Sequence, residues 1–215
     1  MKWSSSKAKL KKRMIEARIF AVSRHRLTTD GDGCTTLVTF NGCPLRCKYC
    51  LNKVSWKEDG GRVYTPETLF EEAKIDQLYF LATRGGVTFG GGEPLLQTEF
   101  IKEFRALCGT NWRLMVETSL NVPLETVQSV DDALDGYIVD IKDMNPEIYL
   151  TYTGKENTPV IRNLEWLLHH GDPDRIIVRV PHIPDYNTDE DVANSMNHLK
   201  KMGVKNFDEF QYVIR

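Results

Sequence analysis

The stretch Asn41-Gly-Cys-Pro-Leu-Arg-Cys-Lys-Tyr-Cys-Leu-Asn52 decides the interpretation of this chain, because it brings Cys43, Cys47 and Cys50 close together. The spacing C-x3-C-x2-C supplies three thiolates. A closed tetrahedral zinc site needs four ligands, and a fully ligated iron–sulfur cube also needs four cysteines. Three thiolates on a 4Fe–4S cube leave one iron without a protein ligand. The spacing therefore predicts a cluster with one iron open to a small molecule.

Other uses of these cysteines compete with that prediction. A zinc knuckle would borrow Cys34 or a histidine as its fourth ligand. Disulfides are disfavoured because five is an odd number of cysteines and no apolar signal segment begins the chain, so we expect a reducing cytoplasm. Cys34 and Cys108 are isolated, and we expect each to be a small buried apolar residue.

Composition and charge exclude several functional classes. The 215 residues are 41% hydrophobic and 27% charged, which is ordinary for a soluble globular protein. The net charge of −2 predicts no attraction to nucleic acid. No apolar run approaches the roughly 20 residues that span a bilayer. Lysines and an arginine crowd residues 2–13, which predicts a solvated basic extension over residues 1–16; a docking patch for an acidic protein partner is the alternative.

Strand-like and helix-like segments alternate along the chain. The predicted strands span residues 17–23, 35–40, 86–89, 113–117, 136–141, 175–180 and 207–214. The predicted helices span residues 66–81, 98–107, 124–134, 160–170 and 189–202. This alternation predicts an α/β fold of parallel βα units, with polar and glycine-rich residues just after the strands. Six units follow the first strand, which is too few for a closed eight-fold barrel.

A second motif, Val87-Thr-Phe-Gly-Gly-Gly-Glu-Pro-Leu95, stands at the end of a predicted strand about 40 residues after the cysteine loop. Gly91 and Gly92 let the backbone approach a ligand without a Cβ clash. Glu93 places a carboxylate or its backbone near the cationic end of that ligand. Together the two motifs resemble the radical S-adenosylmethionine (SAM) superfamily. The resemblance implies one open partial (β/α)6 barrel over residues 1–215, one 4Fe–4S cluster, and SAM on the open iron.

The resemblance narrows further over most of the chain. The segments that carry it are Asp30-Gly-Asp-Gly33, Val139–Glu147, Tyr152–Lys155, Val160–Leu164 and Val178–Asn187. They are similar to those of glycyl-radical-enzyme activating enzymes of the pyruvate formate-lyase activating type. That family usually has DGPG where this chain has DGDG. The resemblance implies that Asp30, Gly31 and Gly33 help to hold the glycine-bearing peptide of a partner enzyme.

Several site residues follow from this resemblance, position by position. The implied cluster ligands are Cys43, Cys47 and Cys50, and the implied SAM contacts are Tyr49, Asn52, Gly91, Gly92, Glu93, Asp140, Lys142 and Arg179. The resemblance also implies a sodium or potassium ion beside SAM, held by Glu117, Thr118 and Asp140. Hard cations prefer such oxygen ligands. Glu117 replaces the family's shorter aspartate.

The resemblance finally implies a reaction. Flavodoxin or ferredoxin reduces the cluster, SAM is cleaved to methionine and a 5′-deoxyadenosyl radical, and this radical abstracts hydrogen from a glycine of a partner glycyl-radical enzyme. Action on a small molecule or a short peptide is the alternative activity, and a non-catalytic metal-binding module is a third. We expect a cytoplasmic monomer that binds neither membrane nor nucleic acid. No cysteine follows Cys108, so no auxiliary cluster is expected in this sequence.

Overall fold

A single sheet organises the residues that the computed structural model describes, which are 14–27, 29–57 and 59–208. The strand order is β3-β1-β2-β4-β5-β6-β7-β8. The strands are β1 (Ala17–Leu27), β2 (Cys34–Phe40), β3 (Arg62–Tyr64), β4 (Gly86–Gly91), β5 (Arg113–Thr118), β6 (Gly136–Asp140), β7 (Ile176–Arg179) and β8 (Asn206–Asp208). Most of the predicted basic extension, residues 1–13, lies outside the described residues.

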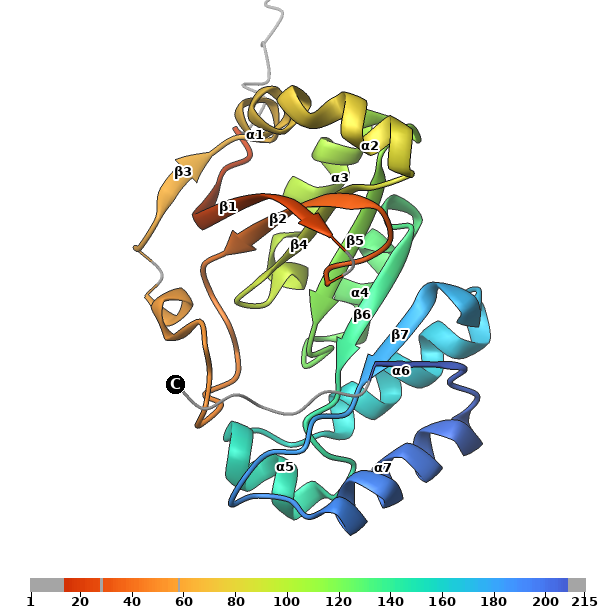
Figure 1. Ribbon diagram of the computed structural model, residues 1–215. Coiled ribbons are helices and arrows are strands. Elements are labelled where there is room, and N and C mark those ends of the chain that lie inside the picture. Colours follow the sequence, from red (N-terminus) through yellow and green to blue (C-terminus); the bar gives the residue numbers. More distant parts are fainter. Residues whose placement is uncertain (1–13, 28, 58, 209–215) are drawn as a thin grey trace, which may run out of the picture.

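Helices connect these strands, with α1 and α2 at the top of Figure 1 and α5 and α7 at the bottom. The α-helices are α1 (Pro66–Ala73), α2 (Gln77–Thr83), α3 (Thr98–Cys108), α4 (Leu124–Val130), α5 (Pro146–Thr153), α6 (Thr158–His170) and α7 (Asp189–Met202). Short 3-10 turns are η1 (Lys53–Trp56), η2 (Lys74–Asp76), η3 (Pro94–Gln97), η4 (Asp131–Ala133) and η5 (Pro173–Arg175). No helix of the described part is long and apolar enough to cross a membrane.

The pairing of the strands confirms the partial barrel. From β2 to β8 the neighbours β2, β4, β5, β6, β7 and β8 are all parallel. Strand β1 is antiparallel to both β2 and β3. The sheet is unclosed, since β3 and β8 are its two ends. The carboxyl ends of six parallel strands therefore meet along one rim, where βα proteins place their chemistry.

The predicted helix over residues 66–81 is wrong in its continuity. Thr65 caps α1 as expected, and its Oγ1 accepts a hydrogen bond from the Thr68 N–H at 3.3 Å. The turn η2 then separates α1 from α2. The carboxylate of Asp76 is fully buried there and accepts two hydrogen bonds from the guanidinium of Arg24, at 2.7 and 2.6 Å. This bidentate ion pair with β1 favours a turn over a continuous helix.

Two elements escape the sequence patterns. Strand β3 has only three residues and exists through its pairing with Ala17–Ile19 of β1. Asn145 caps helix α5, and its Oδ1 accepts a hydrogen bond from the Glu147 N–H at 2.9 Å, but the helix sequence has no clear apolar stripe. The last predicted strand is described only as Asn206–Asp208, and residues 209–214 lie outside the described residues.

Two separate groups of buried residues hold the molecule together. The larger one lies between the sheet and its helices and contains aromatic contacts such as Phe40 with Phe89, whose ring centroids are 5.6 Å apart. Cys34 and Cys108 are buried, as expected. The smaller group contains Leu45, Cys47, Tyr152 and Ile183. This second group lies directly at the cysteine loop and positions it.

Candidate active site

The cysteine loop follows β2 and is fixed by backbone hydrogen bonds on two sides. The N–H groups of Arg46 and Lys48 donate to the carbonyls of Thr153 and Tyr152, at 2.8 and 3.1 Å. These two acceptors belong to the last turn of α5. On the other side, the Gly42 N–H donates to the Ser55 carbonyl of η1 at 2.7 Å. The loop is therefore clamped between α5 and η1.

Tyrosine rings pack against the cysteine loop and determine the position of Tyr49. The Tyr49 ring packs edge-on against Tyr186 and Tyr152, with centroid distances of 5.5 and 6.2 Å. Its hydroxyl donates to the Asp185 carboxylate at 2.9 Å. Tyr49 therefore belongs to the small core that supports the loop. Tyr152 and Tyr186 lie in segments that carry the family resemblance, but their contact with the loop had no signal in the sequence, because α5 and the segment after β7 reach the loop only through the fold.

The thiols of Cys43 and Cys47 lie in an environment that disfavours free thiolates. Burial raises the pKa of the Cys43 thiol to about 12 and that of the Cys47 thiol to about 11, and the charge of Glu93 adds to the effect at Cys43. Because metal ligation requires thiolates, a cation must replace the protons here. Soft sulfur donors select iron–sulfur, zinc or cuprous centres.

The glycine motif brings the end of β4 against the end of β2. Gly91 has φ +95°, and a Cβ on it would lie 2.6 Å from the Thr39 Cβ. A Cβ on Gly92 would lie 2.0 Å from the Gly42 carbonyl oxygen. The Gly91 carbonyl accepts a hydrogen bond from the Asn52 side-chain amide at 3.1 Å. Only glycines allow this approach, which joins the glycine motif to the cysteine loop.

Glu93 was predicted to bring either its carboxylate or its backbone near the ligand, and the structure turns the carboxylate toward the end of β5. The side chain is fully buried, and burial raises its pKa. Its oxygens accept hydrogen bonds from the Thr118 hydroxyl at 2.6 Å and from the Ser119 N–H and hydroxyl at 2.9 and 2.7 Å. The carboxylate therefore ties the end of β4 to the end of β5 and does not line the cavity described next.

A cavity of about 630 Å³ lies on the strand rim and gathers most of the predicted residues. Its predicted lining residues are Cys43, Cys47, Cys50, Asn52, Gly91, Gly92, Glu117, Thr118, Asp140, Lys142 and Arg179. The residues that sequence reasoning missed are Arg26, Leu45, Leu51, Ser119 and Ile138. Tyr49 and Glu93 are the predicted SAM contacts that stand behind the lining. The volume is in the range of small-molecule sites.

Charged side chains on the lining are paired across strands. Arg179 donates to the Glu117 carboxylate at 2.8 Å and to the Asp208 carboxylate at 2.8 Å. Burial raises the pKa of Glu117, whereas Arg179 acts to lower it. Lys142 forms an ion pair with one oxygen of Asp140. The other oxygen, Oδ1, is buried and has no hydrogen-bond partner within the described residues.

The predicted cation site is not brought out by this arrangement. Glu117 faces the guanidinium of Arg179. The Thr118 hydroxyl donates to Glu93 and accepts from the Leu120 N–H at 2.9 Å. Asp140 is paired with Lys142. Each of these side chains already has a partner on the chain, and the Oδ1 of Asp140 alone does not make a cation site, so the sodium or potassium site stays a prediction.

The loop with Asp30, Gly31 and Gly33 lies beside the cavity. Asp30 is buried, and its carboxylate accepts a hydrogen bond from the Arg26 Nε at 2.5 Å. Its carbonyl accepts from the Thr88 hydroxyl of β4. Gly31 has φ +118°, and a Cβ there would lie 3.4 Å from the Met115 side chain of β5. The loop therefore lies against the strands themselves.

Arginines hold the same loop at both of its ends. The Arg179 Nη2 donates to the Thr29 carbonyl at 2.6 Å. Arg113 pairs with Asp32 at 2.6 Å on the exposed side. Arg26 and Arg179 also line the cavity, so the cavity and the loop share two side chains. The signal that could have identified Arg26 is its position four residues before Asp30.

The geometry argues against the zinc alternative. Cys34 begins β2 and the cysteine loop follows its other end, so the two are separated by roughly 20 Å of strand. Among the residues that the structure describes, no three His, Cys, Asp or Glu side chains gather closely enough to hold a single metal ion. The three thiols instead line one cavity, as ligands of different irons in a larger cluster would.

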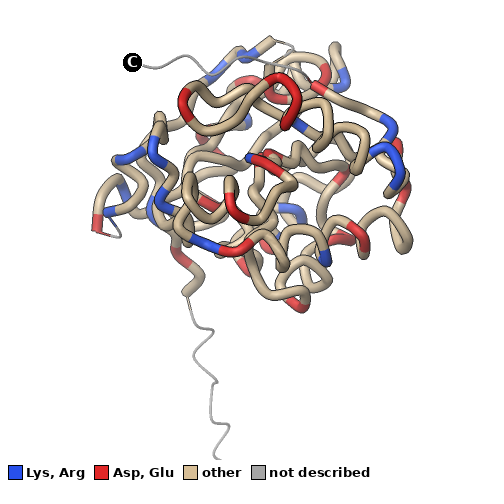
Figure 2. Tube along the Cα trace, turned by 90° about the horizontal axis from the view of Figure 1, so that it is seen from below, with Lys and Arg blue, Asp and Glu red and all other residues tan. Residues whose placement is uncertain are grey.

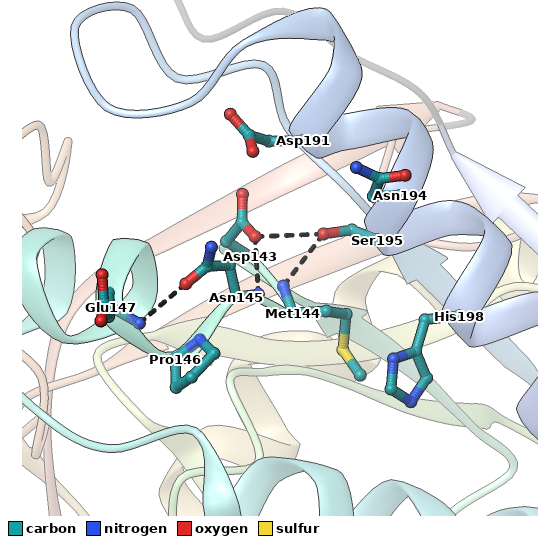
Figure 3. A pocket seen from close by; sticks show the side chains of 9 residues that line it. All are labelled: Asp143, Met144, Asn145, Pro146, Glu147, Asp191, Asn194, Ser195 and His198. Atoms are coloured by element: carbon teal, nitrogen blue, oxygen red, sulfur yellow. Dashed lines mark hydrogen bonds between the residues drawn. The ribbon is translucent and has the colours of Figure 1, made fainter.

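A second hollow of about 480 Å³ lies between the loop after β6 and α7 (Figure 3). Asp143 is buried there and accepts hydrogen bonds from the Asn145 N–H at 2.8 Å and the Ser195 hydroxyl at 3.2 Å. Its other oxygen accepts from the Asn187 side-chain amide at 3.1 Å. Its carboxylate is thus fully occupied by the chain, and it anchors α7 to the rim.

Comparison with known proteins agrees with the cysteine and glycine motifs. The model of the radical SAM superfamily matches residues 37–206. A pyruvate formate-lyase-activating enzyme of Listeria monocytogenes is 32% identical over 197 residues, covering 86% of this chain and 77% of that enzyme. A (2S)-3-sulfopropanediol dehydratase activating enzyme of Klebsiella oxytoca is 30% identical, covering 80% of this chain and 73% of that enzyme. The structure of Streptococcus suis SuiB bound to S-adenosylmethionine has a TM-score of 0.59 at 13% identity, over 82% of this chain and 40% of SuiB, which is a likeness of fold.

Proposed function

The chain belongs to the radical SAM superfamily and is related to the glycyl-radical-enzyme activating enzymes, and on this premise we propose that it generates a glycyl radical in a partner enzyme. The proposal rests on one observation, which is that the two sequence motifs and the charged strand ends line the same cavity. This cavity collects three cysteines, the glycine pair at the end of β4 and the charged ends of β5, β6 and β7. The hollow beneath α7, by comparison, contains none of the three cysteines.

The residues present fit a 4Fe–4S cluster with SAM. Three sulfur donors on one loop suit a cube with one open iron. Gly91 and Gly92 form a cradle that any Cβ would fill. The orphaned Oδ1 of Asp140 is a buried acceptor that awaits a donor, such as a hydroxyl or an amine of a ligand. When bound, the cluster and SAM supply a one-electron reductive cleavage that yields a carbon-centred radical.

The chain itself binds and orients. Cys43, Cys47 and Cys50 would hold the cluster against the small tyrosine core, and Asn52 would fix the glycine cradle beside it. Lys142 and Arg179 would offset the carboxylate charge of SAM, since a buried charge needs a partner. The buried side chains of Leu45 and Ile138, which line the cavity, would exclude water from the radical.

The loop of Asp30, Gly31 and Gly33 would place the partner's glycine beside the cavity. Its position against β4 and β5 supports this role, because a peptide held there reaches the same space as SAM. A flexible peptide pays an ordering entropy, which a larger interface with the rest of the partner must offset. We therefore propose a protein substrate, a low-potential carrier such as flavodoxin or ferredoxin as reductant, and a monomer in the reducing cytoplasm.

One experiment tests the proposal directly. The anaerobically reconstituted protein is incubated with SAM, a reductant and a glycyl-radical enzyme, and the mixture is examined by electron paramagnetic resonance. The expected result is a glycyl radical in the partner with one 5′-deoxyadenosine formed per radical. SAM cleavage without a radical in any candidate partner, together with efficient turnover of a small molecule or short peptide, would overturn it.

A further inference from the structure

The outer surface of the cysteine loop is basic in a chain that is acidic overall. Residues 44–62 contain five Lys and Arg residues against two acidic residues, whereas the net charge of the chain is −2. We call the five cations the loop cation surface; they are Arg46, Lys48, Lys53, Lys57 and Arg62. All five are exposed. Blue stretches lie at the left of Figure 2, on the side where Figure 1 places the segment between β2 and β3.

Within the described residues, these five cations have no ion-pair partners. Lysines on other surfaces do form ion pairs, such as Lys205 with Asp174 at 2.9 Å. Arg46 donates instead to the Cys43 and Leu45 carbonyls at 2.6 and 2.8 Å, and its guanidinium lies 5.4 Å from the centre of the Trp56 ring. The lysines therefore present free positive charge to solvent.

The position of this surface relates it to the cysteines. Lys48 stands between Cys47 and Cys50, and the thiol-bearing residues line the cavity on the inner side of the same loop. Apolar side chains are interspersed with the cations, since Leu51 and Val54 are 67% and 50% exposed. A surface that mixes apolar residues with one sign of charge is suited to a partner protein of opposite charge.

We propose that the loop cation surface is the docking site of an acidic one-electron carrier protein. This inference rests on the proposed function, which requires an electron at the centre held by Cys43, Cys47 and Cys50. In the step, the reduced flavin or iron–sulfur centre of the carrier loses one electron and the centre held by the cysteines gains it. No covalent bond forms or breaks, and no proton is required for the balance.

The physics of such a contact is distinctive. Electron-transfer encounters are weak and bury little area, so charge attraction supplies much of the encounter rate. Exposed charges are screened within about 8 Å at 0.15 M salt. Docking of the carrier through lysines must therefore weaken as the salt concentration rises.

The test compares two triple variants of the reconstituted holoprotein. The loop variant is Lys48→Glu/Lys53→Glu/Lys57→Glu, and Arg46 is spared because it holds the loop carbonyls. The control is Lys74→Glu/Lys200→Glu/Lys201→Glu, which changes the net charge equally at exposed positions of η2 and α7. Iron content and thermal unfolding verify that both variants keep the cluster and the fold.

Calorimetry measures the Kd for flavodoxin as the probe at 50 and 300 mM salt, and stopped-flow spectroscopy measures electron transfer from its reduced form. We expect the loop variant to weaken binding and transfer at low salt by at least about tenfold, or about 1.4 kcal/mol, and the control to change either by less than about threefold. Wild-type binding should weaken with salt. Equal Kd values for both variants, or binding that salt does not alter, would overturn the docking site.

Chemical reductant separates this inference from the proposed function. Dithionite needs no docking surface, so the loop variant should cleave SAM at the wild-type rate with dithionite. If the wild type itself fails to cleave SAM with dithionite, the proposed function fails. If dithionite supports cleavage and the two variants respond equally to flavodoxin, only the docking site fails.

Discussion

Two hollows flank the loop after β6, and they differ in what their polar groups do. In the cavity at the strand rim, Asp140 leaves Oδ1 buried without a partner. In the hollow beneath α7, Asp143 receives hydrogen bonds at both oxygens from the chain itself. The two aspartates are three residues apart, and the oxygens compared are both buried, although the Asp140 side chain as a whole is 32% exposed and Asp143 is 1% exposed. A functional cavity is thus distinguished by the atoms it leaves for a ligand, and a polar lining alone says little.

The largest expected effect concerns the cysteines of the rim cavity. Replacing Cys43, Cys47 or Cys50 with alanine removes one ligand of the cluster, so iron binding and SAM cleavage should be lost entirely. Cys34→Ala and Cys108→Ala should keep both activities, since these residues are buried elsewhere. Iron analysis and 5′-deoxyadenosine formation measure the outcome. Loss of iron in Cys34→Ala would break the distinction between the cavity and the rest of the core.

The next effect separates steric fit from backbone strain. Gly92→Ala places a Cβ 2.0 Å from the Gly42 carbonyl, so the cradle must shift. Overpacking of this kind costs about 1–3 kcal/mol, and SAM binding should be lost with it. Gly154→Ala has open space around it but φ +76°, which costs about 1–2 kcal/mol. It should bind SAM normally. Equal SAM affinity in the two variants would remove the cradle from the site.

The third effect tests the two aspartates against each other. Asp140→Asn should lower SAM affinity about tenfold or more, because a hydrogen bond to a charged group contributes about 1.5–3 kcal/mol. Its free energy of unfolding should also fall, because the buried Lys142 loses the carboxylate with which it forms an ion pair, so the affinity for SAM is what distinguishes the two variants. Asp143→Asn should leave SAM affinity unchanged and lower the free energy of unfolding by about 1–3 kcal/mol, since it loses an acceptor of buried donors. Calorimetric titration with SAM and denaturant unfolding measure both quantities. The reverse pattern would refute the comparison.

The smallest expected effect tests whether Arg26, which lines the cavity, also positions the loop that contains Asp30. Arg26→Gln removes the partner of Asp30, whose exposed fraction is only 4%. The ion pair is partly exposed and contributes about 1 kcal/mol at most, so glycyl radical formed per SAM cleaved should fall about fivefold. Arg113→Gln breaks the exposed pair with Asp32 on the same loop and should leave this ratio unchanged. An equal ratio in both variants would count against a positioning role for Arg26.

The sequence was sufficient where a residue acts through its own chain neighbours. The cysteine spacing and the glycine motif each lie on one short segment, and both ended at the same cavity. The strand series was readable for the same reason, because each strand alternates with a helix along the chain. The orientation of Glu93 was different. Its carboxylate accepts hydrogen bonds from Thr118 and Ser119 at the end of the next strand. No local sequence pattern predicts such a bond.

The same reasoning applies to other residues whose surroundings the sequence did not show. The ring of Tyr49 packs against Tyr152 and Tyr186, which are more than a hundred residues away along the chain, and its contact with SAM stays a prediction. Arg26 lines the cavity only because β1 runs antiparallel to β2. Helix α5 depends on a cap and a few buried aromatic side chains more than on an apolar stripe. Long-range contacts decide all three.

Arg179 connects the binding of a ligand in the cavity with the position of the loop. One guanidinium donates to the Glu117 carboxylate in the cavity wall and to the Thr29 carbonyl at the start of the loop. A ligand that draws this guanidinium toward the cavity therefore weakens its bond to the loop. Thermodynamic linkage requires the converse with the same magnitude. Ligand binding in the cavity and the position of the loop are therefore coupled through the hydrogen bonds of one guanidinium group.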